Sequence, residues 1–63
     1  MNIGKKMKLI RVEKGLKQID MAREMETTQS YISQVENGVI IPNARFIKLF
    51  CLQYGVDKDS LTH

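Results

Sequence analysis

The chain has 63 residues, a formal net charge of +3 and a single cysteine, Cys51. This length allows one domain with a modest core, and the lone cysteine excludes an intrachain disulfide. The N-terminal segment has no apolar run long enough for a signal peptide or a membrane span. We therefore expect one domain, residues 1–63, that stays in the cytoplasm and is stabilised by packing without a cofactor or a metal.

The positive charge is concentrated in the first third of the chain. Within residues 1–23 lie seven of the ten lysines and arginines: Lys5, Lys6, Lys8, Arg11, Lys14, Lys17 and Arg23. Such an asymmetry suits a polyanionic partner. Charge alone does not distinguish that partner from a solvated basic surface.

Helical periodicity begins near the N-terminus. Ile3, Met7 and Ile10 repeat at helical spacing, and the pattern stops at Gly15, a favoured residue just beyond a helix end. These residues predict a first helix over about 3–14.

Two short helices follow the first. The second starts near Gln18 and ends near Glu24 or Met25. Its inner face is expected to hold Met21, Ala22 and Met25. Thr28 suits the N-cap of a third helix over about 28–36, because its hydroxyl can accept an unpaired backbone N–H.

The C-terminal third predicts two more helices. Pro42 keeps the segment before it extended, Asn43 suits an N-cap, and Gly55 suits the end of the fourth helix. Asp57 can cap a last turn over 58–61. The expected core residues of the fourth helix are Phe46, Ile47, Leu49, Phe50 and Cys51. The chain therefore predicts an all-α fold, a compact bundle of five short helices.

The stretch TTQSYISQVENG pairs a buried face with an uncharged polar one. Ile32 and Val35 suit the core, and the other side carries Gln29, Ser30, Ser33, Gln34 and Asn37. Charged residues make up 27% of the chain, so an ordinary solvated face would include some. A helix that enters a DNA groove must avoid carboxylates, and amides offer a donor and an acceptor to a base edge. The pattern predicts the second helix of a helix-turn-helix.

The chain resembles the phage repressor/Cro-type helix-turn-helix family, also called XRE. The resemblance covers almost the whole chain, through IGKKMKLIRVEKGLKQIDMA, TTQSYISQVENG, IPN and YGVDKDSL. It implies a lambda-repressor-like domain with its helix-turn-helix at the second and third helices. It also implies a sequence-specific DNA-binding transcriptional regulator of the repressor type, without catalysis, that binds double-stranded palindromic operators as a homodimer.

The resemblance also implies roles for individual residues. Base reading falls to Gln29, Ser30 and Gln34, and Gln suits bidentate contact with adenine. Ser33 and Tyr31 are second-rank candidates that could reach a base or the sugar-phosphate wall. The residues implied at the DNA backbone are Lys17, Gln18, Tyr31 and Asn37. The alternative for all of these residues is an ordinary helix surface.

Arg11 and Glu36 match a pair that in the family bridges the first helix to the end of the third. We assign both residues a structural role and no role in DNA reading. The self-contact expected of a dimer is at Val56, Leu61 and the neighbouring C-terminal segment.

The chain departs from the family pattern at two helix boundaries. Lys17 replaces the usual Ser or Thr cap, at a cost of about 1 kcal/mol that Asp20 can offset and that a bound phosphate could turn into a gain. Glu26 stands where the family prefers Gly. The turn there is therefore either strained or built without a left-handed residue.

A third departure supports an alternative function. Val39 and Ile40 replace basic loop residues and, with Ile41, expose apolar surface. This alternative is a protein-interaction module, such as an antitoxin or an antagonist, with weak or no DNA binding. An enzyme is not expected, because His63 is terminal, Cys51 suits a small buried apolar position, and no catalytic set can be assembled.

Overall fold

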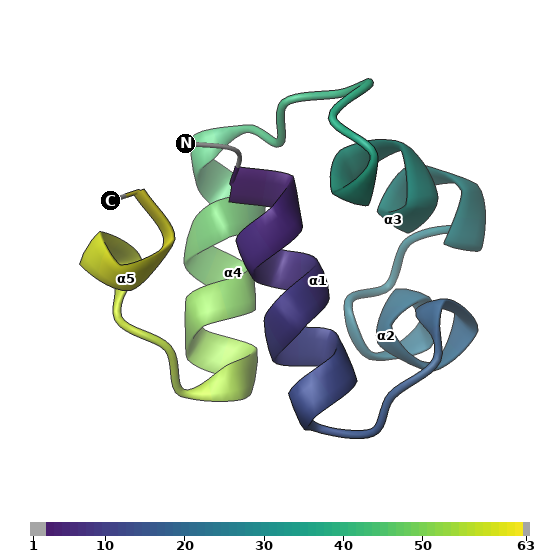
Figure 1. Cartoon of the computed structure of the whole chain (residues 1–63), viewed down its shortest axis with the longest axis horizontal. Coiled ribbons are helices and arrows are strands. Elements are labelled where there is room, and N and C mark those ends of the chain that lie inside the picture. The colour runs from purple at the N-terminus through teal and green to yellow at the C-terminus, as the bar shows by residue number, and fades with distance from the viewer. Residues whose placement is uncertain (1–2, 63) are drawn as a thin grey trace.

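The computed structural model describes residues 3–62, and in that range every regular element is a helix (Figure 1). The helices are α1 (Ile3–Glu13), α2 (Gln18–Glu24), α3 (Gln29–Glu36), α4 (Ala44–Tyr54) and α5 (Lys58–Thr62). The prediction of an all-α bundle of five short helices is confirmed, with boundaries within one or two residues. The terminal His63 lies outside the described residues.

The arrangement places α1 at the centre of the bundle. It contacts α3 on one side and α5 on the other, while α2 packs against α3 and α4 contacts α5. Figure 1 shows α2 and α3 together on one side of α1, and α4 and α5 on the opposite side. The helix-turn-helix pair therefore forms one flank of the molecule.

A single cluster of buried side chains joins these helices. Its members are Met7, Met21, Ala22, Ile32, Val35, Phe50, Tyr54 and Leu61. Two sequence predictions are wrong here. Leu49, expected in the core, is 46% exposed, because Phe46 and Phe50 set the inward face of α4 and Leu49 lies off that face. Leu61, expected at a dimer contact, is 1% exposed and fills the core of its own chain.

The predicted helix caps are present. The Thr28 hydroxyl oxygen accepts a hydrogen bond from the Tyr31 backbone N–H at 3.1 Å, and the Asn43 side-chain oxygen accepts one from the Phe46 N–H at 2.8 Å. At the start of α2, the Lys17 N–H donates to the Asp20 carboxylate at 2.9 Å. Asp20 thus satisfies the backbone N–H of Lys17, whereas the Lys17 side chain has no acceptor and leaves the N–H groups of the first turn of α2 without a side-chain cap.

The turn after α2 contains a left-handed residue at Glu26. Its φ is 55°, so it is left-handed, and it is the one non-glycine residue of the described chain with a positive φ. The N–H of Thr27 bonds to the Ala22 carbonyl at 2.8 Å and that of Glu26 to the Arg23 carbonyl at 3.2 Å. This is the Schellman closure, which requires a left-handed residue at the position of Glu26. The turn is therefore the strained alternative, built with a side chain where glycine is favoured.

Candidate nucleic-acid interface

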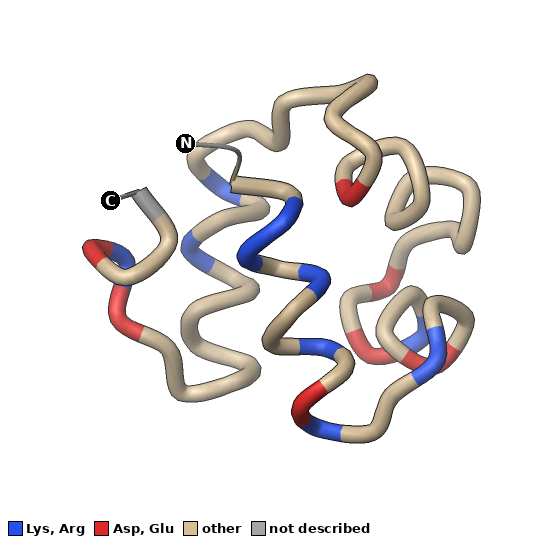
Figure 2. Tube along the Cα trace, viewed as in Figure 1, with Lys and Arg blue, Asp and Glu red and all other residues tan. Residues whose placement is uncertain are grey.

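The outer side of α3 is the polar, uncharged face predicted from the sequence. Gln29, Ser30, Gln34 and Asn37 are exposed and Ser33 is half-buried, while Ile32 and Val35 on the inner side are each 2% exposed. Figure 2 shows no charged residue on α3 except the acidic one at its C-terminal end. The five polar residues of α3 and its C-cap thus share one side of the helix, as the sequence predicts.

Arg11 and Glu36 fix the C-terminal end of this helix to α1. The Arg11 guanidinium binds Glu36 in a bidentate manner, from Nε to Oε2 at 2.7 Å and from Nη2 to Oε1 at 3.1 Å. Arg11 Nη1 also donates to the Leu16 carbonyl at 2.7 Å. The two charged residues are only 9% and 5% exposed. The hydrogen bonds of this buried pair are satisfied, so the pair holds one geometry. It therefore sets the orientation of α3 relative to α1.

Gln18 joins the same pair from α2. Its Nε2 donates to Glu36 Oε1 at 3.0 Å, a contact that sequence reasoning missed because the two residues are 18 positions apart. The carboxylate of Glu36 therefore links α1, α2 and α3. The Gln18 amide nitrogen carries two N–H groups, so the predicted contact with a phosphate stays open to it as a prediction.

Asn37 and Ser33 lie together at the exposed end of the polar face. The Asn37 side-chain nitrogen donates to the Ser33 hydroxyl oxygen at 3.4 Å, a long and weak hydrogen bond. Both side chains can exchange this bond for one to a partner at little cost.

Tyr31 has a packing role that the sequence did not indicate. It is half-buried, and its ring meets that of Phe46 on α4 edge to face, with centroids 5.2 Å apart and planes at 69°. Such pairs are favourable beyond the area they bury. The ring of Tyr31 therefore braces α3 against α4, whatever its hydroxyl contacts.

Lys17 is exposed directly before α2, where an extended backbone leads into the helix. Its predicted contact with a phosphate remains a prediction.

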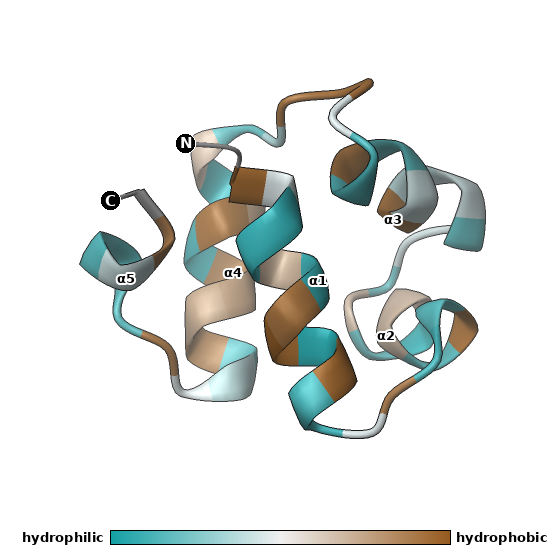
Figure 3. Cartoon of the chain, in the orientation of Figure 1, coloured by the Kyte–Doolittle hydropathy of each residue, from teal (hydrophilic) through white to brown (hydrophobic). Residues whose placement is uncertain are grey.

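The segment between α3 and α4 exposes apolar side chains beside the polar face. Val39 is 70% and Ile41 86% exposed, but Ile40 is half-buried against the core and Pro42 is buried. The N–H groups of Val39 and Ile40 both bond to the Gln34 carbonyl, at 2.9 and 3.2 Å. Figure 3 shows this loop as a brown apolar stretch next to α3. Only two of its three predicted partner-binding residues point outward.

A buttress between α2 and α4 was also missed. The Tyr54 hydroxyl donates to the Glu24 carboxylate at 2.8 Å, and the Lys14 ammonium lies 5.9 Å from the centre of the Tyr54 ring. Burial first, and then the hydrogen bond and the charge of Glu24, raise the pKa of Tyr54 far above its usual value. The phenol therefore stays protonated and remains a donor. No local pattern marks a contact between residues 30 positions apart.

Other kinds of site are not evident in the described part of the chain. Across residues 3–62, no three His, Cys, Asp or Glu side chains group in a way that could hold a metal ion. None of the described helices is long and apolar enough to cross a membrane. Cys51 is half-buried on α4, and burial, followed by the charge of Asp57, raises the pKa of its thiol.

Comparison with known proteins agrees with this geometry. A helix-turn-helix family model matches residues 7–61, which is most of the chain. The chain is also 30% identical over 59 residues to the ImmF control region 10 kDa protein of Bacillus phage phi105. That match covers 94% of this chain and 66% of the phage protein, so the chain spans just under two thirds of that relative. The search of solved structures gives no significant match. The chain thus belongs to the helix-turn-helix family of the phage repressor/Cro (XRE) type.

Proposed function

We propose that this chain is a sequence-specific transcriptional repressor that places α3 in the major groove of a palindromic operator. The observation that carries the proposal is an uncharged amide and hydroxyl face on a helix whose orientation is fixed by the Arg11–Glu36 pair. An α-helix with its side chains is about 10–12 Å in diameter, and a major groove about 12 Å wide admits it.

We assign base contacts and DNA-backbone contacts to different side chains. Gln29 and Gln34 read bases, since each amide can donate and accept at an adenine edge, and Ser30 and Ser33 supplement them. The residues proposed at the sugar-phosphate backbone are Lys17, Gln18, Tyr31 and Asn37. These contacts set the position of the protein on DNA and carry no sequence preference themselves.

We propose that the protein acts in the cytoplasm, binds DNA as a homodimer and has no catalytic activity. A two-fold dimer matches a palindromic site, because each subunit then meets the same half-site. Because Leu61 is buried in the core, Val56 is the named residue of the expected dimer contact that can still meet a second subunit. Val56 is half-buried.

Selection of bound sequences from a random duplex pool tests the proposal. We expect an enriched palindrome whose half-sites are about one helical turn apart, and an affinity that falls as salt is raised. An enriched sequence without two-fold symmetry would contradict the dimer. A pool that shows no enrichment would contradict sequence-specific binding.

Two substitutions test the contacts with the DNA backbone. Gln18→Ala and Asn37→Ala should each weaken binding to operator and random DNA by a similar factor, because phosphates are the same in both. Filter binding or fluorescence anisotropy on the two duplexes measures this ratio. A variant that loses affinity for the operator alone would move its residue to the base-reading set.

The exposure of Val39 and Ile41 favours a second candidate function, a protein-interaction module such as an antitoxin or an antagonist. Val39→Lys with Ile41→Lys separates the two functions. If DNA is the partner, the new cations should leave DNA binding equal or tighter, because they lie beside the polar face of α3. A chain that binds no DNA and loses a protein partner on this change would favour the second candidate.

A further inference from the structure

The outer side of α1 carries an exposed surface that DNA reading does not use. We name it the α1 outer face, formed by Lys5, Lys8, Leu9 and Val12. These residues recur at spacings of three and four, so they share one side of the helix. Leu9 is 62% and Val12 57% exposed, whereas Met7 on the inner side is 2% exposed. α1 is thus apolar on two sides, and only one of them is covered in this chain.

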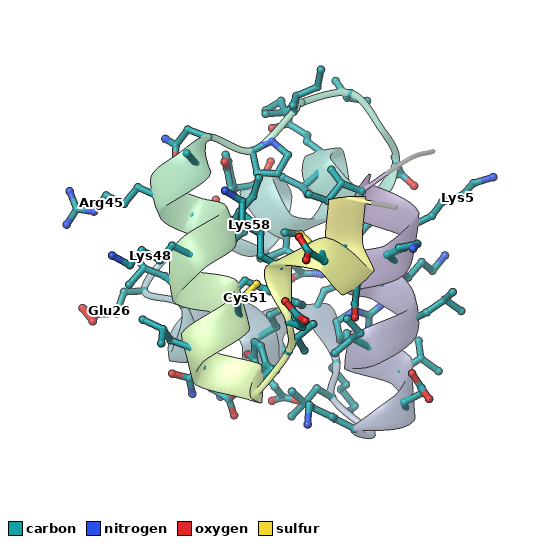
Figure 4. All side chains as sticks on the ribbon, turned by 90° about the vertical axis from the view of Figure 1, so that its left-hand side faces the viewer. Lys5, Glu26, Arg45, Lys48, Cys51 and Lys58 are labelled. Atoms are coloured by element: carbon teal, nitrogen blue, oxygen red, sulfur yellow. The ribbon has the colours of Figure 1, made fainter. Side chains whose placement is uncertain are left out.

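This face lies away from the proposed DNA surface. α1 turns its inner side to α3, through the contact between Arg11 and Glu36. In Figure 4, Lys5 projects outward from the α1 side, and Arg45 and Lys48 project outward from the α4 side opposite. A molecule bound on the α1 outer face would leave the polar face of α3 open.

A shallow hollow adjoins the face where α1 meets α5. It measures about 250 Å³ and is lined by Lys6, Leu9, Ile10, Glu13 and Ser60. Lys6 Nζ donates to the Ser60 carbonyl at 2.7 Å, which ties the two helices together at the rim of the hollow. Since Leu9 belongs to both the face and the hollow, one apolar side chain of a partner could insert beside it.

The charges on this face indicate what would cover it. Lys5 and Lys8 are exposed, each one turn before one of the two apolar residues, and no carboxylate lies among the four residues. Figure 2 shows the basic residues in blue along α1. Cations beside an apolar strip complement a segment that carries carboxylates beside its own apolar residues. A second copy of this face would instead bring lysines against lysines.

The size of the face points to a short segment. α1 has 11 residues and is about 16 Å long, so the face offers far less than the roughly 1,000 Å² of a stable interface between folded proteins. We propose that the α1 outer face docks a short acidic amphipathic helix of another protein, with one apolar side chain in the hollow beside Leu9. This contact does not depend on which DNA, if any, α3 reads.

A synthetic peptide tests the proposal directly. The probe is a helical peptide with leucines at i and i+4 and glutamates beside them, titrated into the full ¹⁵N-labelled chain. We expect the largest backbone amide shifts at Lys5, Lys8, Leu9 and Val12. Leu9→Ser with Val12→Ser, and separately Lys5→Glu with Lys8→Glu, should each weaken binding at least tenfold.

Two controls make the result specific. Leu52→Ser with Lys48→Glu changes the same residue types on α4, where Leu52 is 72% exposed, and should leave the peptide affinity unchanged. The same peptide with lysine in place of glutamate should not bind. Thermal melts of each variant should match the unmodified chain, because the substituted side chains are exposed.

Several results would overturn the proposal. These are the absence of shifts with the acidic peptide, shifts centred on α3 or α4, and an equal loss of affinity in the α4 control. Loss of folding in Leu9→Ser with Val12→Ser would show that these residues belong to the core. Binding to phosphatidylserine vesicles without binding to the peptide would assign the face to a membrane surface instead. A failure of the chain to bind DNA would leave this test unaffected.

Discussion

The two ends of α3 are built differently. At the C-terminal end, Glu36 is buried and bound by Arg11 from α1 and by Gln18 from α2. At the N-terminal end, Gln29 and Ser30 are exposed, and the local hold is the hydrogen bond from the Tyr31 N–H to Thr28. The buried end of α3 is thus held by charged side chains, whereas the exposed end carries neutral polar side chains.

This difference separates orientation from recognition. A buried ion pair adds little net stability compared with well-packed apolar residues, but it imposes one geometry. An exposed amide adds nothing to the fold and is free to pair with a base. Changes at the anchored end should therefore have the larger effect on folding, and changes to the exposed amides of α3 should affect DNA binding alone.

The largest effect is expected from Arg11→Ala. It leaves the Glu36 carboxylate buried with no cation, which should cost about 3–5 kcal/mol and largely unfold so small a domain. Urea denaturation followed by circular dichroism measures this loss. The double variant Arg11→Met with Glu36→Leu removes both charges, and it should regain most of that stability. If Arg11→Ala alone unfolds at the same urea concentration as the unmodified chain, the anchored end is not anchored by this pair.

A smaller effect is expected from Thr28→Ala at the open end. The change removes the hydroxyl that caps the Tyr31 N–H, at a cost of about 1 kcal/mol. The same urea titration measures it, with Thr28→Ser as the control that keeps the cap. A loss as large as that of Arg11→Ala would erase the difference between the two ends.

The smallest effect, and one of opposite sign, is expected at the turn that leads into α3. Glu26→Gly should stabilise the chain by about 1 kcal/mol or less, because glycine adopts the left-handed conformation without strain. The matched control is Arg23→Gly inside α2, which should destabilise by about 0.5–1 kcal/mol. Thermal melting of both variants shows whether each change raises or lowers the melting temperature. A lower melting temperature for Glu26→Gly would show that its side chain outweighs the backbone strain.

Local signals made most of the fold predictable from the sequence. Thr28 and Asn43 mark helix starts through their own side chains, and Gly15 and Gly55 mark helix ends through a positive φ. These features depend on residues within one turn. The five helices could therefore be placed before their packing was known.

Features that depend on packing were not predictable in the same way. The burial of Leu61 and the exposure of Leu49 follow from how α4 and α5 close on α1. The contacts of Gln18 with Glu36 and of Tyr54 with Glu24 join distant positions. The Arg11–Glu36 pair was expected only through the resemblance to a family, since no local spacing indicates it.

The most direct test of the account is made on the exposed polar face of α3. Gln29→Ala and Gln34→Ala are each measured against the selected operator and against operators altered at one base pair at a time. We expect each variant to lose about 1–3 kcal/mol on the operator and almost nothing on random DNA, and to become indifferent to its own base pair, with α3 intact by circular dichroism. If both variants keep the full sequence preference of the unmodified chain, α3 does not read the operator and the account is wrong.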